Sequence, residues 1–189
     1  MKNEQKIIVF DIDDTLIVPN DNYAHIYRTN NGERVVLNTR EFADESARGI
    51  VADYDFSDFR NPDLVYKSIV TGKLSTRNMR FLKAYLAAGY KFCFLTSRGC
   101  ADVAFNATLD KMCQYMGDNL RKKYIHKISC GVNDERVFFT KNMSSADRKA
   151  FVLKNLCKSY DTVVFVDDDK GNRQAAIKQR IPNLFVMKA

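Results

Sequence analysis

The sequence lacks any apolar run that approaches the roughly 20 residues of a membrane-spanning helix. Its N-terminal stretch, MKNEQKIIVFDIDD, has acidic residues where a signal peptide would have an apolar core. The first absence excludes a spanning helix, and the second argues against secretion. We therefore expect a soluble, cytoplasmic protein with no membrane partner.

The sequence also lacks paired cysteines. Its five cysteines are odd in number and form no CxxC pair, which predicts reduced thiols and argues against a disulfide framework or a zinc site. No repeat, low-complexity tract or linker rich in proline, glycine and serine divides the 189 residues. We expect one domain over residues 1–189, large enough to bury about 70% of the surface of its unfolded chain.

Acidic charge is scarce in the second half of the chain. Residues 1–94 contain 13 basic and 13 acidic residues, whereas residues 95–189 contain 17 basic and 10 acidic residues, so the whole net charge of +7 lies there. A basic surface attracts anionic partners such as phosphates or nucleic acids. A solvated face that only maintains solubility is the alternative.

Apolar runs of strand length alternate with helical patterns. The predicted strands cover residues 6–11, 90–96, 124–129, 161–167 and 183–187. The predicted helices cover residues 75–89, 101–121, 144–157 and 171–179, with Ser75 and Ser144 as caps. This alternation predicts an α/β fold with three layers, in which a Rossmann-like parallel sheet has helices on both faces.

Residues 17–71 interrupt this alternation and read as an insertion. Residues 24–38 resemble a hairpin with Asn31 and Gly32 in its turn, and a short helix over 38–48 precedes the acidic, aromatic segment 53–59. We expect a flap or small cap beside the first strand. Its aromatic residues could stack on a base or bury themselves within the cap.

Polar residues follow three of the predicted strands, and ligands bind at this end of a parallel sheet. They are Asp11 and Asp13; Thr96, Ser97 and Arg98; and Asp167 and Asp168, with Lys149 near the start of a helix. Clustered carboxylates repel one another unless a positive charge lies among them. Mg²⁺ prefers oxygen ligands and is usually bound by carboxylates together with a substrate phosphate. The pattern therefore predicts magnesium and a phosphate ester substrate.

The segment FDIDDTL resembles the DxDx[TV] signature of the haloacid dehalogenase-like (HAD) superfamily. FLTSR, Lys149 and VFVDDD resemble its second, third and fourth motifs, in the same order and with similar spacing. The resemblance covers the chain except residues 17–71 and part of 98–147. The run from Asp147 onward also resembles, more loosely, the phosphatase half of phage polynucleotide kinases, which remove 3′-phosphates.

The superfamily resemblance implies a role for each matching residue. It makes Asp11 the nucleophile and a metal ligand, Asp13 the general acid and base with its carbonyl on the metal, Thr96 a hydrogen-bond donor to the phosphoryl group, Lys149 a counter-charge, Asp167 a metal ligand, and Asp168 a ligand directly or through water. Ser97 and Arg98 would bind substrate. An aspartate at position 13 is typical of phosphatases, whereas the ATPases of the superfamily have threonine there.

Several positions keep alternative interpretations. Lys154 competes with Lys149 for the motif lysine, although Lys149 lies nearer the helix start. Arg98 could bind a phosphate or pair with an acid of the insertion. Asp14 fits a turn and Asp169 a helix cap, and we expect His25 and His126 to have packing roles. The basic run 121–123 with Lys127 could contact nucleic acid or form a solvated helix end.

These patterns predict a magnesium-dependent phosphomonoesterase that works through an aspartyl-phosphate. The substrate would be a nucleotide or a nucleic-acid 3′-phosphate end, and a small-metabolite phosphatase is the alternative. A non-catalytic phosphate- or nucleic-acid-binding module is the alternative from another class. Because such a module would be expected to have lost Asp11 or Asp13, the presence of both favours an enzyme.

Overall fold

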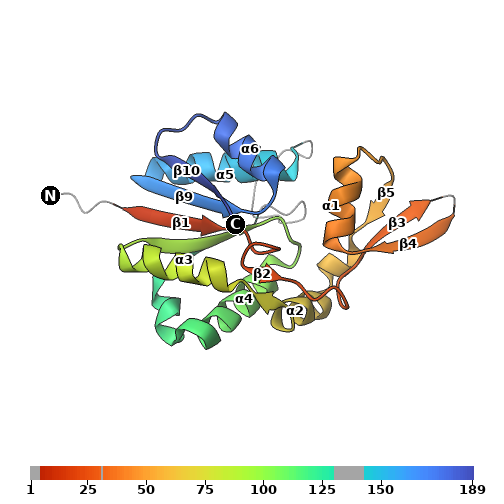
Figure 1. Cartoon of the computed structure of the whole chain (residues 1–189), viewed down its shortest axis with the longest axis horizontal. Helices are drawn as coiled ribbons and strands as arrows, with labels where there is room; N and C mark the ends of the chain where they lie inside the picture. The colour runs from red at the N-terminus through yellow and green to blue at the C-terminus, as the bar shows by residue number, and fades with distance from the viewer. Residues whose placement is uncertain (1–4, 31, 130–142) are drawn as a thin grey trace.

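A five-stranded parallel sheet forms the centre of the protein (Figure 1). The computed structural model describes residues 5–30, 32–129 and 143–189. In spatial order the strands are β10 (Leu184–Lys188), β9 (Thr162–Asp167), β1 (Lys6–Phe10), β7 (Lys91–Thr96) and β8 (Tyr124–Ser129). All five strands occupy the segments predicted from the sequence. β1 lies at the centre, between β9 and β7, so the residues that follow it emerge in the middle of one sheet edge.

Helices cover both faces of this sheet, which confirms the predicted α/β fold with three layers. On one face lie α2 (Pro62–Val70), α3 (Thr76–Ala87) and α4 (Ala101–Met116), and on the other lie α5 (Ser145–Ser159) and α6 (Lys170–Lys178). β1 is buried on both sides: Ile8 and Phe10 pack toward α3 and α4, whereas Ile7 and Val9 pack toward α5. A continuous apolar strand is what such a two-sided core requires.

The predicted helix caps are present. The Ser75 and Ser144 hydroxyls each accept a hydrogen bond from the backbone three residues later. One prediction of length was wrong: the helix expected to reach residue 121 ends at Met116. Gly117 has a φ of 90°, which stops the helix, and a 3₁₀ segment, η2 (Asp118–Lys123), follows.

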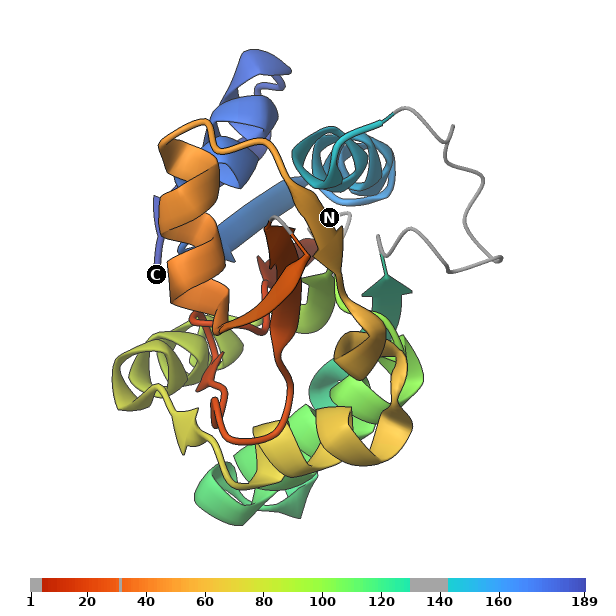
Figure 2. The ribbon, with the colours of Figure 1, turned by 90° about the vertical axis from the view of Figure 1, so that its right-hand side faces the viewer.

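Within residues 17–71, a smaller lobe lies at one end of the sheet (Figures 1 and 2). Its elements are β3 (Ile26–Asn30), β4 (Glu33–Leu37), α1 (Thr39–Ala47), β5 (Asp53–Asp55) and η1 (Ser57–Arg60), whereas β2 (Ile17–Val18) and α2 of the same segment contribute Ile17, Val65 and Ile69 to the main core. β3 pairs with β4 and β5, and β2 pairs with β6 (Lys73–Leu74), which brings the two ends of the lobe together. The expected hairpin pairing and the short helix are confirmed, and the structure shows Asn38 as the helix cap; the predicted turn residue Asn31 lies outside the described residues.

The aromatic residues of segment 53–59 pack on one another and on α1. The ring of Phe42 lies 5.0 Å from that of Tyr54 and 5.2 Å from that of Phe56, both edge to face. Phe59 continues this cluster toward the sheet. These contacts favour burial of the aromatic residues within the lobe over stacking on a base.

Two close approaches join this lobe to the loop after β7. A Cβ at Gly99 would lie 2.6 Å from the Phe59 carbonyl oxygen, so only glycine allows the two backbones to come this close. The Cys100 thiol donates to the Arg60 carbonyl oxygen over 2.9 Å. Within the lobe, Asp58 accepts hydrogen bonds from the backbone N–H of His25 and from the Tyr27 hydroxyl.

Two phenylalanines on neighbouring strands should respond differently to truncation. Phe165 on β9 is 0% exposed, so Phe165→Ala should lower the free energy of unfolding by about 3–5 kcal/mol. Phe185 on β10 is 54% exposed, and Phe185→Ala should change it by less than about 1 kcal/mol. Urea denaturation of both variants measures the difference, and equal losses would contradict the described core.

Candidate active site

The predicted site residues lie at the C-terminal edge of the sheet. β1 runs parallel to β7 and β9, with Phe10 opposite Phe94 and Val166. The chain therefore carries Asp11 past the end of β1 beside Asp167 at the end of β9, and the backbone N–H of Asp11 donates to the Val166 carbonyl oxygen. Thr96 ends β7 on the other side of Asp11.

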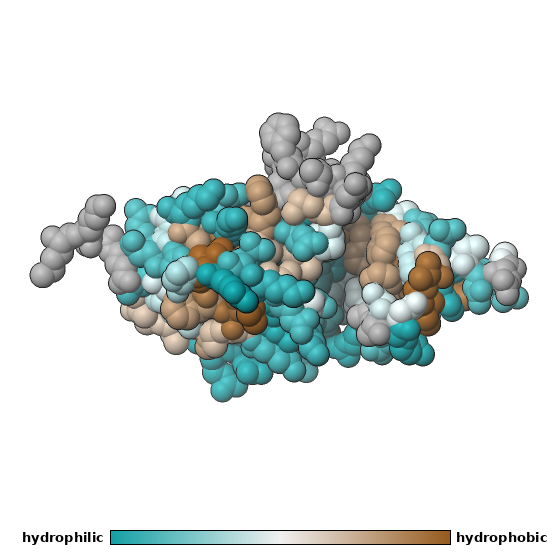
Figure 3. Space-filling model, turned by 90° about the horizontal axis from the view of Figure 1, so that it is seen from above, coloured by the Kyte–Doolittle hydropathy of each residue, from teal (hydrophilic) through white to brown (hydrophobic). Residues whose placement is uncertain are grey.

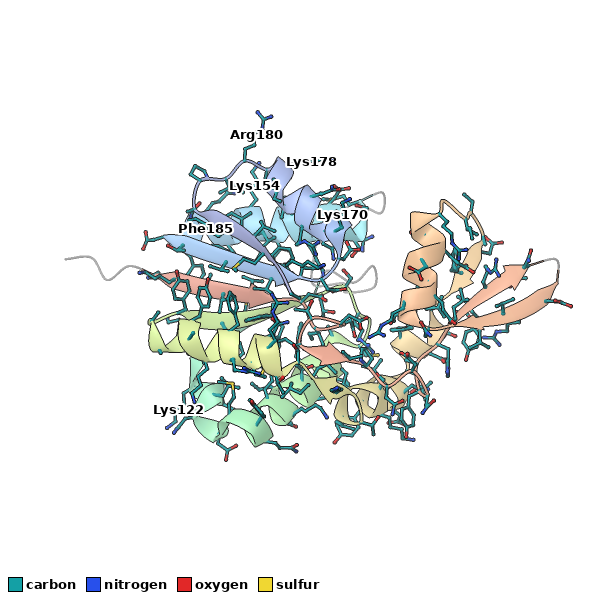
Figure 4. All side chains as sticks on the ribbon, in the orientation of Figure 1. Lys122, Lys154, Lys170, Lys178, Arg180 and Phe185 are labelled. Atoms are coloured by element: carbon teal, nitrogen blue, oxygen red, sulfur yellow. The ribbon has the colours of Figure 1, made fainter. Side chains whose placement is uncertain are left out.

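Lys149 lies between the Asp11 and Asp167 carboxylates and is hydrogen-bonded to both. Its ammonium donates to Oδ1 of Asp11 over 2.6 Å and to Oδ2 of Asp167 over 2.8 Å, and all three side chains are buried. Lys149 lies in the first turns of α5, from which a side chain leans toward the helix start and the sheet edge. Lys154 lies on the exposed outer side of the same helix (Figure 4), which decides between the two lysines in favour of Lys149.

Burial and charge shape the ionisation of this group. Burial raises the pKa of Asp11 well above its ordinary value, and Lys149 acts in the opposite direction. For Lys149, burial alone would lower the pKa, but the Asp11 and Asp167 carboxylates raise it above its ordinary range. Lys149 is therefore a fixed positive charge between two carboxylates.

Asp168 lies beside this group and is held by Thr15. The Thr15 hydroxyl donates to Oδ1 of Asp168 over 3.1 Å and accepts from its backbone N–H over 3.0 Å. Burial, together with the charge of Asp167, raises the pKa of Asp168 to about 6. Thr15 therefore ties the loop after β1 to the loop after β9.

The two neighbouring aspartates have the positions expected of a turn and a cap. Asp14 has a φ of 53° and lies 3.5 Å from the exposed Arg40 of α1. Asp169 is the N-cap of α6, where its side chain accepts from the backbone N–H of Asn172 over 2.7 Å.

Three residues that the sequence interpretation missed support the carboxylates. The Asn172 amide donates to both oxygens of Asp167, at 3.0 and 3.2 Å. Arg173 donates to the Asp167 carbonyl oxygen over 2.8 Å, and the buried Asn78 amide donates to the Thr15 carbonyl oxygen over 2.8 Å. A signal existed for the first two, because the first turn of a helix capped by Asp169 must lie next to Asp167.

Asp13 faces Arg98 and not the carboxylate group. The Arg98 guanidinium forms a bidentate contact with the Asp13 carboxylate, with Nε at 3.0 and 3.1 Å from its two oxygens. Arg98 also donates to the Ser68 hydroxyl over 3.1 Å and lies 5.0 Å from the centre of the Phe59 ring. One sequence alternative paired Arg98 with an acid of the insertion; its carboxylate partner is Asp13, which precedes the insertion.

The other residues of the second motif also lie at this edge. The buried Thr96 hydroxyl accepts from the Arg98 backbone N–H over 3.1 Å, which closes a tight turn after β7. The Ser97 hydroxyl contacts the Ser145 hydroxyl at the start of α5. The side chains of His126 and Lys127, which the sequence analysis considered, lie outside the described residues, as does that of Lys123.

The cluster of the Asp11, Asp167 and Asp168 carboxylates has the spacing of ligands to a divalent cation. Asp11, Asp167 and Asp168 each place one carboxylate oxygen within 4.8 Å of the others. Opposite oxygens of a magnesium shell lie about 4.2 Å apart, since each Mg–O distance is about 2.1 Å. Together with Asp13, the described part of the site holds four carboxylates, against Lys149, Arg98 and Arg173 as basic residues. The excess of acidic groups would be balanced by a bound cation.

The described residues include no helix that combines the length and the apolar character needed to cross a bilayer.

Comparison with known families and curated proteins gives one match. The profile of a family described as "Protein of unknown function (DUF2608)" matches residues 1–181. None of the curated proteins compared with the sequence matches it.

Comparison with solved structures gives similar folds at low identity. A chain of the "Structure of Pnkp1/Rnl/Hen1 complex" is 17% identical with a TM-score of 0.51; it covers 100% of this chain, which spans 47% of that one. The "Phospho-Aspartyl Intermediate Analogue of Phosphoserine phosphatase" is 14% identical with a TM-score of 0.49, and the match covers 94% of this chain and 84% of that one. HAD family hydrolase t0658 from Salmonella enterica subsp. enterica serovar Typhi is 17% identical with a TM-score of 0.48, and the match covers 91% of this chain and 59% of that one. At these identities the likeness concerns the fold alone.

Proposed function

The chain belongs to the DUF2608 family, whose description names no reaction, and we propose from its site that it is a magnesium-dependent phosphomonoesterase that works through an aspartyl-phosphate. The observation that carries the proposal is the buried Asp11–Lys149–Asp167 group with Asp13 two residues farther along the chain. Nucleophile, counter-charge and second carboxylate lie together at one sheet edge, which is the arrangement that phosphoryl transfer needs.

The first step forms a bond between Asp11 and phosphorus. Lys149 holds Oδ1 of Asp11, so Oδ2 is the oxygen proposed to attack. As the new bond forms, the bond from phosphorus to the ester oxygen breaks, and the leaving oxygen takes a proton from the protonated Asp13 carboxyl group. Arg98 holds the Asp13 carboxylate in place, and its positive charge would favour the phosphoryl group beside Asp13.

The second step releases phosphate. Asp13, now ionised, takes a proton from a water molecule that attacks phosphorus, and the bond between phosphorus and Asp11 breaks. The products are inorganic phosphate and free Asp11, and the proton remains on Asp13. A bound magnesium ion would be held by Asp11, Asp167 and Asp168, with the Asp13 carbonyl, and would supply electrostatic stabilisation of the phosphoryl charge.

Trapping the covalent intermediate tests this function. The protein is mixed with Mg²⁺ and phosphomonoesters, namely nucleoside 5′- and 3′-monophosphates, 3′-phosphorylated oligonucleotides and sugar phosphates, and quenched in acid. We expect release of phosphate and a peptide that contains Asp11 and is heavier by one phosphoryl group. Excess chelator should stop both, and re-added Mg²⁺ should restore them.

The same experiment separates the alternatives. A nucleotide or a nucleic-acid 3′-phosphate end is the proposed substrate class, and hydrolysis restricted to sugar phosphates would instead support a small-metabolite phosphatase. Binding of a phosphate ester without turnover or phosphopeptide would support the non-catalytic module. Turnover that persists in excess chelator would contradict the role of the metal.

A further inference from the structure

The outer surface of α5 and α6 carries positive charge. Its exposed basic residues are Lys154, Lys158, Lys170, Lys178 and Arg180, which together define the α5–α6 surface. The sequence contains no acidic residue between positions 148 and 160 or between 170 and 182. Seen from above, this side of the protein is largely hydrophilic around smaller hydrophobic areas (Figure 3). Beyond the exposed Asp147 in the first turn of α5 and Asp169 at the cap of α6, the charged residues exposed on the two helices are all basic.

This charge is not explained by internal pairing. Within residues 5–30, 32–129 and 143–189, no ion pair joins Lys154, Lys170, Lys178 or Arg180 to a carboxylate. Lys154 and Lys158 are four residues apart on α5, a spacing at which like charges destabilise a helix. Lys158 and Lys178 lie in the last turns of their helices, where a positive charge is favourable, but neither position explains Lys154 or Lys170, which suit an external anion.

Both helices of the surface begin at the candidate active site. α5 supplies Lys149 from its first turns, and α6 begins directly after Asp168 and its cap, Asp169. Lys154, Lys170, Lys178 and Arg180 lie on the same side of the sheet, and Lys122 lies on the opposite side (Figure 4). Lys170 and Lys178 are separated by about 12 Å along α6, a length that spans several phosphates of a nucleic-acid strand.

We propose that the α5–α6 surface binds the phosphate backbone of a single-stranded nucleic acid whose terminal phosphate enters the site. The proposal rests on the proposed phosphomonoesterase function, and it names the substrate class and the surface that selects it. A polyanion with a phosphate ester at its end fits a basic surface that starts at a phosphate site. An anionic membrane is the competing occupant, because Phe151 on α5 and Ile177 on α6 are exposed beside the basic residues, and lipid vesicles are therefore one arm of the test.

Two charge-matched variants test the surface. In the surface variant, Lys154, Lys158, Lys178 and Arg180 are replaced by glutamine. In the control variant, Arg80, Lys83, Lys91 and Lys122, all exposed residues outside α5 and α6, are replaced by glutamine. Both variants lose the same net charge and the same residue types. Any difference between them therefore reports where on the protein the charge lies.

Binding is measured with a labelled, 3′-phosphorylated single-stranded oligonucleotide, and Asp11→Asn is added to every protein to prevent turnover. Four phosphate contacts, each contributing about 0.7 to the salt slope, predict about a 50-fold loss of affinity when salt rises from about 50 mM to about 200 mM. We expect this dependence in the parent and control proteins and its loss in the surface variant. Equal behaviour of the two variants, or binding to anionic lipid vesicles but not to the oligonucleotide, would overturn the proposal.

A small aryl phosphate separates this proposal from the proposed function. With Asp11 intact, the surface variant should hydrolyse the aryl phosphate at the rate of the unmodified protein and lose at least tenfold in kcat/KM on the oligonucleotide. Equal kcat/KM values on the oligonucleotide would overturn the surface proposal and leave the phosphomonoesterase standing. If no ester is hydrolysed, the proposed phosphomonoesterase function is wrong, and so is the proposal that the terminal phosphate of a nucleic acid enters the site.

Discussion

Replacement of Asp11 by asparagine should abolish phosphomonoesterase turnover while leaving the fold intact. Asparagine has nearly the same shape and keeps an oxygen for Lys149, but its amide cannot form the phosphoryl ester. We expect a fall in kcat of at least about 10³-fold, which corresponds to about 4 kcal/mol in the barrier. The fall should be accompanied by loss of the phosphopeptide.

The stability of this variant provides an independent readout. Because Asp11→Asn removes one of the excess negative charges of the site, its thermal midpoint should equal or exceed that of the parent protein. Asp53→Asn, the same change at an exposed position on β5, is the control and should alter neither property. Turnover retained in Asp11→Asn would remove Asp11 as the nucleophile.

Replacement of Lys149 by methionine should lower both the stability and the activity of the protein. The methionine keeps the apolar stem but leaves the buried Asp11 and Asp167 carboxylates without their shared cation. Loss of one partner of a buried ion pair costs about 3–5 kcal/mol, so we expect the thermal midpoint to fall by about 10 °C and turnover to be lost. Differential scanning calorimetry in the absence of divalent ions measures the fall.

A lysine on the same helix offers a matched control. Lys154→Met changes an exposed side chain and should shift the midpoint by no more than about 2 °C. The deficit of Lys149→Met should also shrink as the pH is lowered. Unpaired buried carboxylates have a higher pKa in the folded state than in the unfolded state, so the folded state binds protons more tightly and gains stability as the pH falls. A pH-independent deficit would indicate lost packing and not lost charge.

Much of the fold could be predicted because its signals are local. A buried parallel strand such as β1 reads as an unbroken apolar run, and the caps of α3 and α5 follow from single serines. The predicted end of α4, at residue 121, lies five residues beyond the observed end at Met116. The apolar pattern continues through Leu120, whose side chain is buried although it belongs to the 3₁₀ segment η2. The periodicity of apolar residues shows which side of a segment is buried, but it does not show where the backbone hydrogen bonds of an α-helix end.

The site was predictable only in part. Parallel strands bring their ends to one edge, which placed Asp11, Thr96 and Asp167 together before any geometry was known. The contact between Arg98 and Asp13 could not be predicted, because it depends on how the turn after β7 directs one long side chain. For Asn172 the sequence signal was partial: a helix capped by Asp169 must begin next to Asp167, but the angle of α6 decides that the Asn172 amide reaches both carboxylate oxygens.

The contacts around Gly99 have a mechanical consequence for the smaller lobe. The loop after β7 touches η1 at Phe59 and Arg60, and Asp58 in turn ties η1 to the start of the hairpin through His25 and Tyr27. These contacts brace the base of the lobe against the loop after β7, and we expect the lobe to act as a fixed wall of the site. We expect the size of the opening to be set by static shape, so that product leaves without waiting for the lobe to move.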